Sequence, residues 1–135
     1  MRAIGSDTRP VQTVHLFAGG SSQALRYFNV HTDAEGGVAL TTNEFTPGRP
    51  FRVVAFRARA QLDPGSETIK LSRVTAGSTV EVATYTEDPG GADLWIHSGE
   101  IAVDFTADQG MTFSHQCAAY PADVMAAFDL IWLDE

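Results

Sequence analysis

The sequence predicts an all-β domain built as an antiparallel sandwich. Turn signals recur about every 8 to 12 residues along most of the chain, which is the spacing expected of a sandwich or barrel. The longest regular pattern, Phe51 to Leu62, has a period of two, with Arg57, Arg59 and Gln61 on its polar side. A helix would scatter these arginines among the apolar residues, so the stretch is predicted to be a half-buried strand. Its apolar side is expected to consist of Val54, Phe56, Ala58, Ala60 and Leu62.

The size and composition of the chain indicate one domain with a core of its own. The chain has 135 residues, 44% of them hydrophobic, which is enough to bury a core without metal or disulfide cross-links. Cys117 is the single cysteine and is expected to be a buried, inert thiol. No apolar run reaches the length of a membrane span, and the first ten residues lack the apolar segment of a signal peptide, so a soluble, non-secreted protein is predicted.

Charge is distributed unevenly along the chain. All nine lysine and arginine residues lie at or before Arg73, whereas eleven acidic residues and no base follow it. The net charge of −8 argues against a nucleic-acid-binding protein, because affinity for phosphate requires a contiguous basic surface. The acidic part either meets a basic partner or serves only to solvate strands and turns, and the second interpretation is favoured.

The first fifty residues are predicted to form an N-terminal arm and attachment region. Residues 1–10 show no periodicity, and Val11 to Phe17 alternates as a strand or a docked extended arm. Two further strands are expected at Leu25 to Thr32 and Val38 to Thr42. The sequence Pro47-Gly48-Arg49-Pro50 is the strongest break in the chain, so it is taken as the boundary between region 1–50 and a sandwich domain at 51–135.

The remaining strands follow at short intervals. They are expected at Thr68 to Val74, Thr79 to Thr86, Leu94 to His97, Glu100 to Thr106, Met111 to Ala119 and Val124 to Leu133. The segment 121–132 is ambiguous, because Pro121 and Asp123 also suit the first turn of a short helix. A strand is favoured, since Phe128, Leu130 and Trp132 alternate with other residues where the domain needs a closing strand.

No motif for catalysis, a cofactor or a metal is found. The four histidines, His15, His31, His97 and His115, are scattered without ligand spacing. Ser98 lies next to His97 and Ser114 next to His115. Neighbouring strand residues point to opposite faces, so neither serine is expected to pair with its histidine as a nucleophile. The acidic loop from Glu87 to Asp93 is interpreted as a solvated turn rather than a calcium site. A non-enzymatic protein without cofactor is therefore predicted.

Two aromatic side chains are candidates for a sugar-stacking platform. Most aromatic residues are expected in the core, with Trp132 at the end of the last strand as an example. If any aromatic side chain is exposed for binding, Trp95 on a short edge-like strand and Tyr85 are the expected ones.

Residues 51–135 resemble the small β-sandwich proteins found among the structural proteins of tailed bacteriophages. The resemblance covers the alternating first strand, the amphipathic pair from Ile69 to Tyr85, the segment from Gly99 to Phe105, and the closing aromatic strand Phe128 to Glu135. It implies a jelly-roll virion protein, made in the host cytoplasm, that is usually oligomeric, with a trimer favoured. Residues 1–50 have no counterpart and are expected to attach it.

The leading functional hypothesis is accordingly a capsid decoration or cement subunit that binds the major capsid protein or other virion subunits. Membrane and nucleic-acid partners are not expected. A tail, baseplate or fibre module and a glycan-binding adhesin module are the alternatives. The predicted partner-binding residues are Val11, Val14, Leu16, Phe17, Tyr27, Phe28, Arg57 and Arg59.

Overall fold

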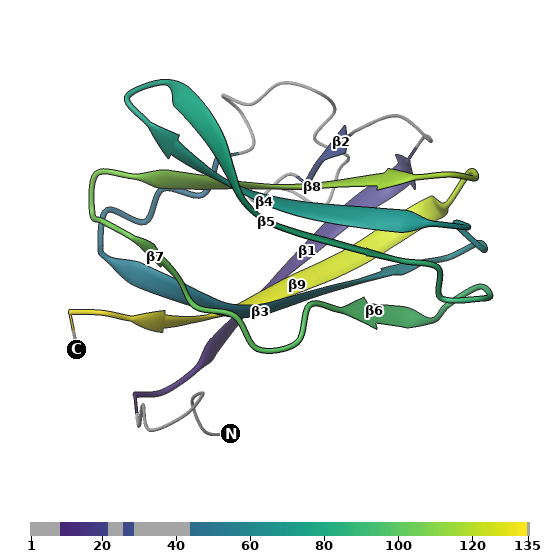
Figure 1. Cartoon of the computed structure of the whole chain (residues 1–135), viewed down its shortest axis with the longest axis horizontal. Coiled ribbons are helices and arrows are strands. Elements are labelled where there is room, and N and C mark those ends of the chain that lie inside the picture. Colours follow the sequence, from purple (N-terminus) through teal and green to yellow (C-terminus); the bar gives the residue numbers. More distant parts are fainter. Residues whose placement is uncertain (1–8, 22–25, 29–43, 135) are drawn as a thin grey trace.

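Two antiparallel sheets pack face to face in the computed structural model, which describes residues 9–21, 26–28 and 44–134 (Figure 1). The first sheet has the order β1-β9-β3-β6, and β7 also pairs with β3. Its strands are β1 (Gln12–Ser21), β9 (Ala122–Trp132), β3 (Phe51–Ala60), β6 (Trp95–His97) and β7 (Val103–Phe105). The second sheet has the order β2-β8-β4-β5, with β2 (Arg26–Tyr27), β8 (Gly110–Cys117), β4 (Glu67–Thr75) and β5 (Ser78–Glu87).

The predicted antiparallel β-sandwich is confirmed. Within the described ranges every element is a strand, including β9, where a short helix was the alternative. The strand predicted at Leu25 to Thr32 is described only in part, as β2, and the one predicted at Val38 to Thr42 lies outside the described residues. None of the described residues belongs to a helix long and apolar enough to cross a membrane.

The core lies between the sheets and is rich in phenylalanine. Alternation along β9 turns Val124, Ala126, Phe128 and Leu130 inward, where all four are buried. On the opposite sheet, Phe113 packs against Phe128 with ring centroids 6.1 Å apart. Most ring pairs of the core make tilted or edge contacts, whereas Phe51 and Phe105 stack with their centroids 4.6 Å apart. Its fully buried phenylalanines are Phe28, Phe51, Phe56, Phe105, Phe113 and Phe128.

An irregularity in β3 changes which of its residues face the core. The pairing with β9 shifts between Val53 and Ala55, so Val53 lies in the core cluster although it is out of phase with Phe56. Val54 is therefore on the other side, in a small separate cluster with Ile131. Leu62, predicted at the buried end of this pattern, lies beyond the strand and is exposed. A bulge reverses the phase of alternation, and the sequence alone does not reveal it.

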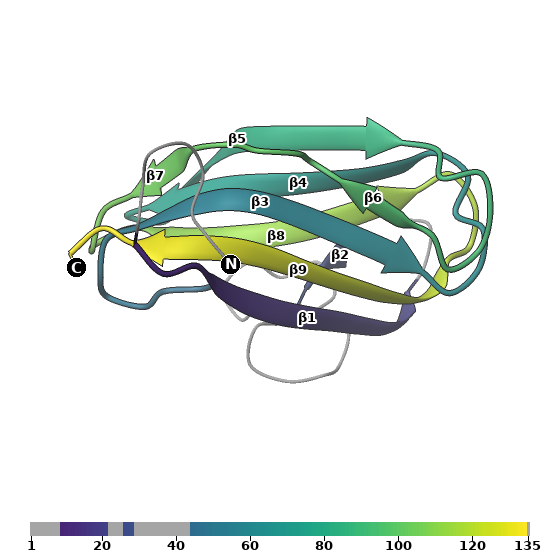
Figure 2. The ribbon, with the colours of Figure 1, turned by 90° about the horizontal axis from the view of Figure 1, so that it is seen from below.

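The described part of the N-terminal region is integrated into the sandwich. β1 pairs along β9, from Gln12 opposite Leu130 to Ala18 opposite Val124. β2 pairs with β8 in the other sheet, and Phe45 forms a bridge to Met111. Figure 2 shows β1 lying beside β9 over most of its length. Among the described residues before residue 50, β1 thus belongs to the first sheet and β2 to the second, and the attachment role expected of 1–50 stays a prediction.

Candidate binding face

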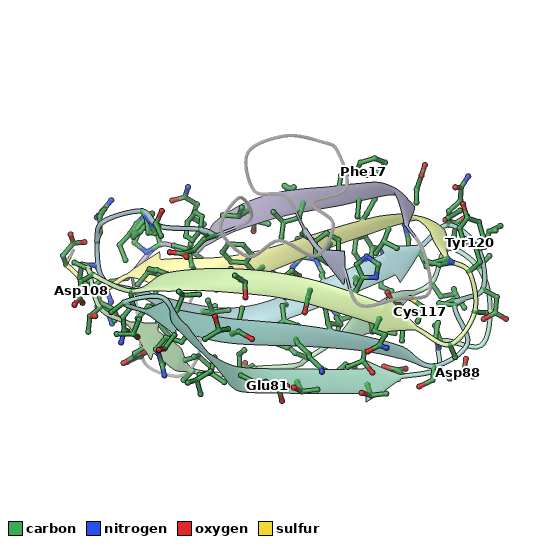
Figure 3. All side chains as sticks on the ribbon, turned by 90° about the horizontal axis from the view of Figure 1, so that it is seen from above. Phe17, Glu81, Asp88, Asp108, Cys117 and Tyr120 are labelled. Atoms are coloured by element: carbon green, nitrogen blue, oxygen red, sulfur yellow. The ribbon has the colours of Figure 1, made fainter. Side chains whose placement is uncertain are left out.

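The side of the first sheet that points away from the second sheet is called the outer face here. Because side chains alternate along a strand, the outer face receives Thr13, His15 and Phe17 from β1 and Met125 and Asp129 from β9. Figure 3 shows Phe17 on β1, at the edge of the sandwich. Three further strands contribute Arg52, Arg57, Arg59, Trp95, His97 and Asp104.

A polar triad connects three neighbouring strands at the centre of the outer face. The Thr13 hydroxyl donates a hydrogen bond to Oδ1 of Asp129 over 2.6 Å, and Arg57 Nη1 donates to Oδ2 over 3.1 Å. Only 7% of Asp129 is exposed, so its charge needs both partners. The triad gives the face a fixed, charge-balanced centre at the junction of β1, β9 and β3.

Arg59 lies beside this centre with an unusual set of neighbours. Its guanidinium carbon is 5.1 Å from the centroid of the Trp95 ring, and Nη2 lies 3.4 Å from the sulfur of Met125. Among the described residues, no carboxylate is within ion-pair distance of Arg59. A guanidinium stacked on an indole is stabilised by a cation–π contact, which leaves its other N–H groups available to a partner.

Two hollows flank these side chains. One has a volume of about 310 Å³ and is lined by His15, Phe17, Arg57, Trp95 and Met125, among others. The other measures about 180 Å³ and lies toward the end of the sheet, between Phe17, Arg59, Gln61, Asp93, Asp123 and Met125. Phe17 and Met125 border both hollows, so they form the apolar ridge between them.

Ion pairs border the opposite end of the face. The hydrogen bond from Arg52 Nε, 2.6 Å long, lowers the pKa of Asp104. Arg49 donates to Asp134 over 2.6 Å, which lowers the pKa of that carboxyl. Arg49 also lies 4.1 Å from the centroid of Trp132. These pairs are exposed, so they add little stability and define a polar rim.

The structure divides the predicted partner-binding residues into two groups. Phe17, Arg57 and Arg59 lie together on the outer face, and Val11 packs there against the Val54–Ile131 cluster. Leu16 and Phe28 are buried in the chain's own core, and Val14 packs against that core. Leu16 and Phe28 therefore expose little surface, whereas Val14 is only partly buried. The side chain of Tyr27 lies outside the described residues.

The two predicted glycan-binding aromatics lie on different sheets. Trp95 is on the outer face and 40% exposed. Tyr85 is on β5, packs against the core cluster and donates from its hydroxyl to Glu87 over 2.7 Å. This bond raises the pKa of the Tyr85 hydroxyl. Trp95 and Tyr85 do not form one platform.

A second group of titratable side chains lies inside the sandwich, and of its members only Cys117 was predicted to be buried. Glu67 begins β4 and is fully buried, and among the described residues neither carboxylate oxygen has a hydrogen-bond partner. Burial raises the pKa of Glu67 to about 7. On β8, Cys117 lies opposite it, and burial together with the Glu67 charge raises the pKa of the thiol to about 12. The sulfur is 4.0 Å from Nδ1 of His115.

The described residues contain no group of three or more histidine, cysteine or acidic side chains placed to hold a metal ion.

Met125 is a member of the outer face that was not predicted from the sequence. It stands in an apolar strand pattern, where nothing distinguishes an outward methionine from a core one.

Comparison with solved structures identifies the fold. The globular domain of zebrafish complement 1qA matches with a TM-score of 0.53 and 14% sequence identity, over 90% of this chain and 96% of that domain. This likeness shows that the fold is a jelly-roll β-sandwich. A mitogen from Yersinia pseudotuberculosis matches over 94% of this chain and 89% of its own, at 10% identity and a TM-score of 0.44.

PirA matches over 96% of this chain and 99% of its own, at 11% identity and a TM-score of 0.42. No protein-family model and no curated protein sequence matches the chain. At these identities the likeness concerns the fold alone, because one sandwich fold supports many functions.

Proposed function

We propose that this chain is a non-enzymatic subunit of a larger protein assembly and that its outer face meets further copies of the same chain. The composition of that face carries the proposal. It presents Phe17, Trp95, Met125, Arg57 and Arg59, while its described strands contain no lysine or glutamate. Aromatic residues, methionine and arginine are enriched at protein interfaces, whereas lysine and glutamate are depleted there.

The outer side of the second sheet has the opposite character. Its outward side chains include Thr68, Lys70, Glu81 and Thr86, which bond to one another across β4 and β5. Short hydroxyl side chains and exposed ion pairs are typical of a surface in contact with water. The contrast between the two sheets supports a single attachment face on β1-β9-β3-β6.

The internal arrangement of the outer face favours binding over chemistry. The polar groups at its centre, Thr13, Asp129 and Arg57, are engaged with one another. The two hollows beside the Phe17–Met125 ridge can receive side chains of a facing subunit, which is how interface anchors are usually accommodated. A preorganised face of this kind loses little conformational entropy on binding.

A change of Met125 to glutamate tests the proposed contact. It places a charge on the ridge between the hollows, so we expect the variant to sediment at the single-chain mass of 14.5 kDa while the wild type sediments at a multiple of it, with three copies favoured. Val80→Glu is the matched control, because Val80 is 61% exposed on β5, in the other sheet. A wild type that sediments as a single chain would refute the proposal.

The biological setting we propose for this assembly is the one predicted from the sequence, a phage virion with this chain as a capsid decoration subunit. Its support is the resemblance of residues 51–135 together with an attachment face. Mass spectrometry of purified particles should detect the chain, and antibody labelling of intact and tailless heads should place it on the head. Absence of the chain from purified particles would exclude the virion role. The proposal of self-association would then be decided by the sedimentation experiment.

Glycan binding by Trp95 is a second candidate. The indole is 40% exposed and carries Arg59 on its ring, an arrangement that can stack a sugar and bind its hydroxyl or carboxylate groups. A glycan array with Trp95→Ala as the control tests it. Equal signals from both proteins, or no bound sugar, would exclude this function.

A further inference from the structure

Three loops meet at the end of the sandwich where β3 ends and β9 begins (Figure 1). They are residues 61–66 between β3 and β4, 88–94 between β5 and β6, and 118–121 between β8 and β9. We call this surface the loop end. In Figure 3 it is the end that carries Tyr120 and Asp88, opposite the end with Asp108.

Backbone hydrogen bonds hold the three loops together. The Leu62 N–H donates to the Pro121 carbonyl over 3.0 Å, and the Ala119 N–H donates to the Pro64 carbonyl over 2.9 Å. The Asp93 N–H donates to the Ala60 carbonyl over 2.9 Å. These bonds join the 61–66 loop to the 118–121 loop and attach the 88–94 loop to the end of β3.

The loop end is apolar and exposed at its tips. Leu62 is 45% exposed, Leu94 47% and Tyr120 52%, one on each loop. Among the described residues only Val80 and Trp95 are other large apolar side chains with comparable exposure, and Trp95 directly follows Leu94. Soluble proteins seldom gather exposed apolar side chains at one place unless the place binds something.

Acidic side chains surround these tips, and the loops contain no basic residue. The acids of residues 61–66, 87–94 and 118–123 are Asp63, Glu87, Asp88, Asp93 and Asp123. The nearest base on the adjoining hollow is Arg59, which lies over Trp95. Such a surface repels nucleic acid and anionic lipid and attracts a basic protein segment.

We propose that the loop end is a second docking surface, which binds a basic segment of a partner protein through its apolar side chains. Leucine- or aromatic-type side chains of the segment would cover Leu62, Leu94 and Tyr120, while its lysine or arginine residues would face the acidic rim. This surface adjoins the outer face, with which it shares the hollow lined by Asp93 and Asp123.

A synthetic peptide of alternating lysine and leucine is a suitable probe. We expect it to shift the amide NMR signals of residues 61–66, 88–94 and 118–123 in the full chain. Leu62→Ser and Tyr120→Ser should each raise the dissociation constant of the peptide about tenfold or more. The double variant Asp63→Asn with Asp93→Asn should raise it by a similar factor. These side chains are exposed, so the variants should fold like the wild type.

Matched controls lie on the second sheet. Val80→Ser and Glu81→Gln on β5 should leave peptide binding unchanged. A peptide of alternating glutamate and leucine should bind about tenfold more weakly or not at all. Amide shifts confined to β5, unaltered binding by the loop variants, or no binding of the lysine–leucine peptide would overturn the proposal. Binding of anionic vesicles or duplex DNA that depends on Leu62 and Tyr120 would overturn it as well.

Discussion

Replacing Glu67 with glutamine should change how the stability of the protein depends on pH. The carboxyl is buried without a hydrogen-bond partner among the described residues, and its pKa in the folded protein is about 7 against an ordinary value of 4.5. In the unfolded chain it ionises near the ordinary value. The folded protein therefore holds a proton on Glu67 that the unfolded chain has lost between these two pH values.

The sign and size follow from this difference. Below pH 4.5 the group is protonated in both states and has no effect on stability. As the pH rises toward about 7 and beyond, the folded state is progressively destabilised, because burial disfavours the carboxylate. Since each pKa unit corresponds to about 1.4 kcal/mol, the loss reaches about 3 kcal/mol above about pH 8.

Urea denaturation of both proteins at about pH 5 and about pH 8 measures the effect. Glu67→Gln should gain about 2 to 3 kcal/mol relative to the wild type between the two conditions, because the amide does not ionise. Other titratable groups near Glu67 are Glu87 on β5 and His115 and Cys117 on β8. They are the same in both proteins, so comparing the proteins isolates Glu67.

The control is Glu87→Gln, which alters the exposed glutamate directly opposite Glu67 in the register of β4 and β5. Its stability should depend on pH like that of the wild type below about pH 8, because Glu87 is exposed and exposed charges contribute little to stability. Parallel profiles for Glu67→Gln and the wild type would refute the account of a buried, uncompensated carboxyl.

Three further predictions concern the outer face, the core and the thiol. Arg57→Ala should destabilise the fold by about 2 kcal/mol or more in urea denaturation, because it removes a partner of the nearly buried Asp129. The double variant Arg57→Ala with Asp129→Ala should recover part of this loss. If the free-energy losses of the two single variants simply added in the double variant, the prediction would be contradicted. Phe128→Ala should cost about 3 to 5 kcal/mol by the same measurement, since the ring is fully buried between the sheets; a cost below about 1 kcal/mol would count against the described core. Cys117 should react with iodoacetamide only after unfolding, because it is buried and its pKa is about 12. Mass spectrometry measures the alkylation, and rapid alkylation of the folded protein would contradict the prediction.

Alternation of side chains was enough to predict most of the fold. The two-residue period of Phe51 to Leu62 placed Arg57 and Arg59 on the polar side of β3, where the structure has them. Turn residues located the remaining strands, including β9, to within a few residues. These features are local, since they depend on the preferences of neighbouring residues.

What escaped prediction depends on pairing between distant segments. The shift between Val53 and Ala55 is set by the register of β3 against β9, and it alone moves Val54 to the outer face. Glu67 is buried where β4 pairs with β8, opposite Cys117. Sequence alone does not reveal this pairing, and a glutamate at the start of a strand ordinarily indicates a solvent-exposed position. The outer face itself joins β1 to β9 across most of the sequence, so no short motif could reveal it.

Crosslinking through a single introduced cysteine tests the central claim, that the outer face lies against another copy of the chain. Met125→Cys places a thiol on the ridge between the two hollows, while the native Cys117 is buried and does not compete. With a short bismaleimide, this variant should form covalent dimers of twice 14.5 kDa, and the Val80→Cys control should remain as single chains. Single chains from Met125→Cys, or equal crosslinking by Val80→Cys, would contradict the account.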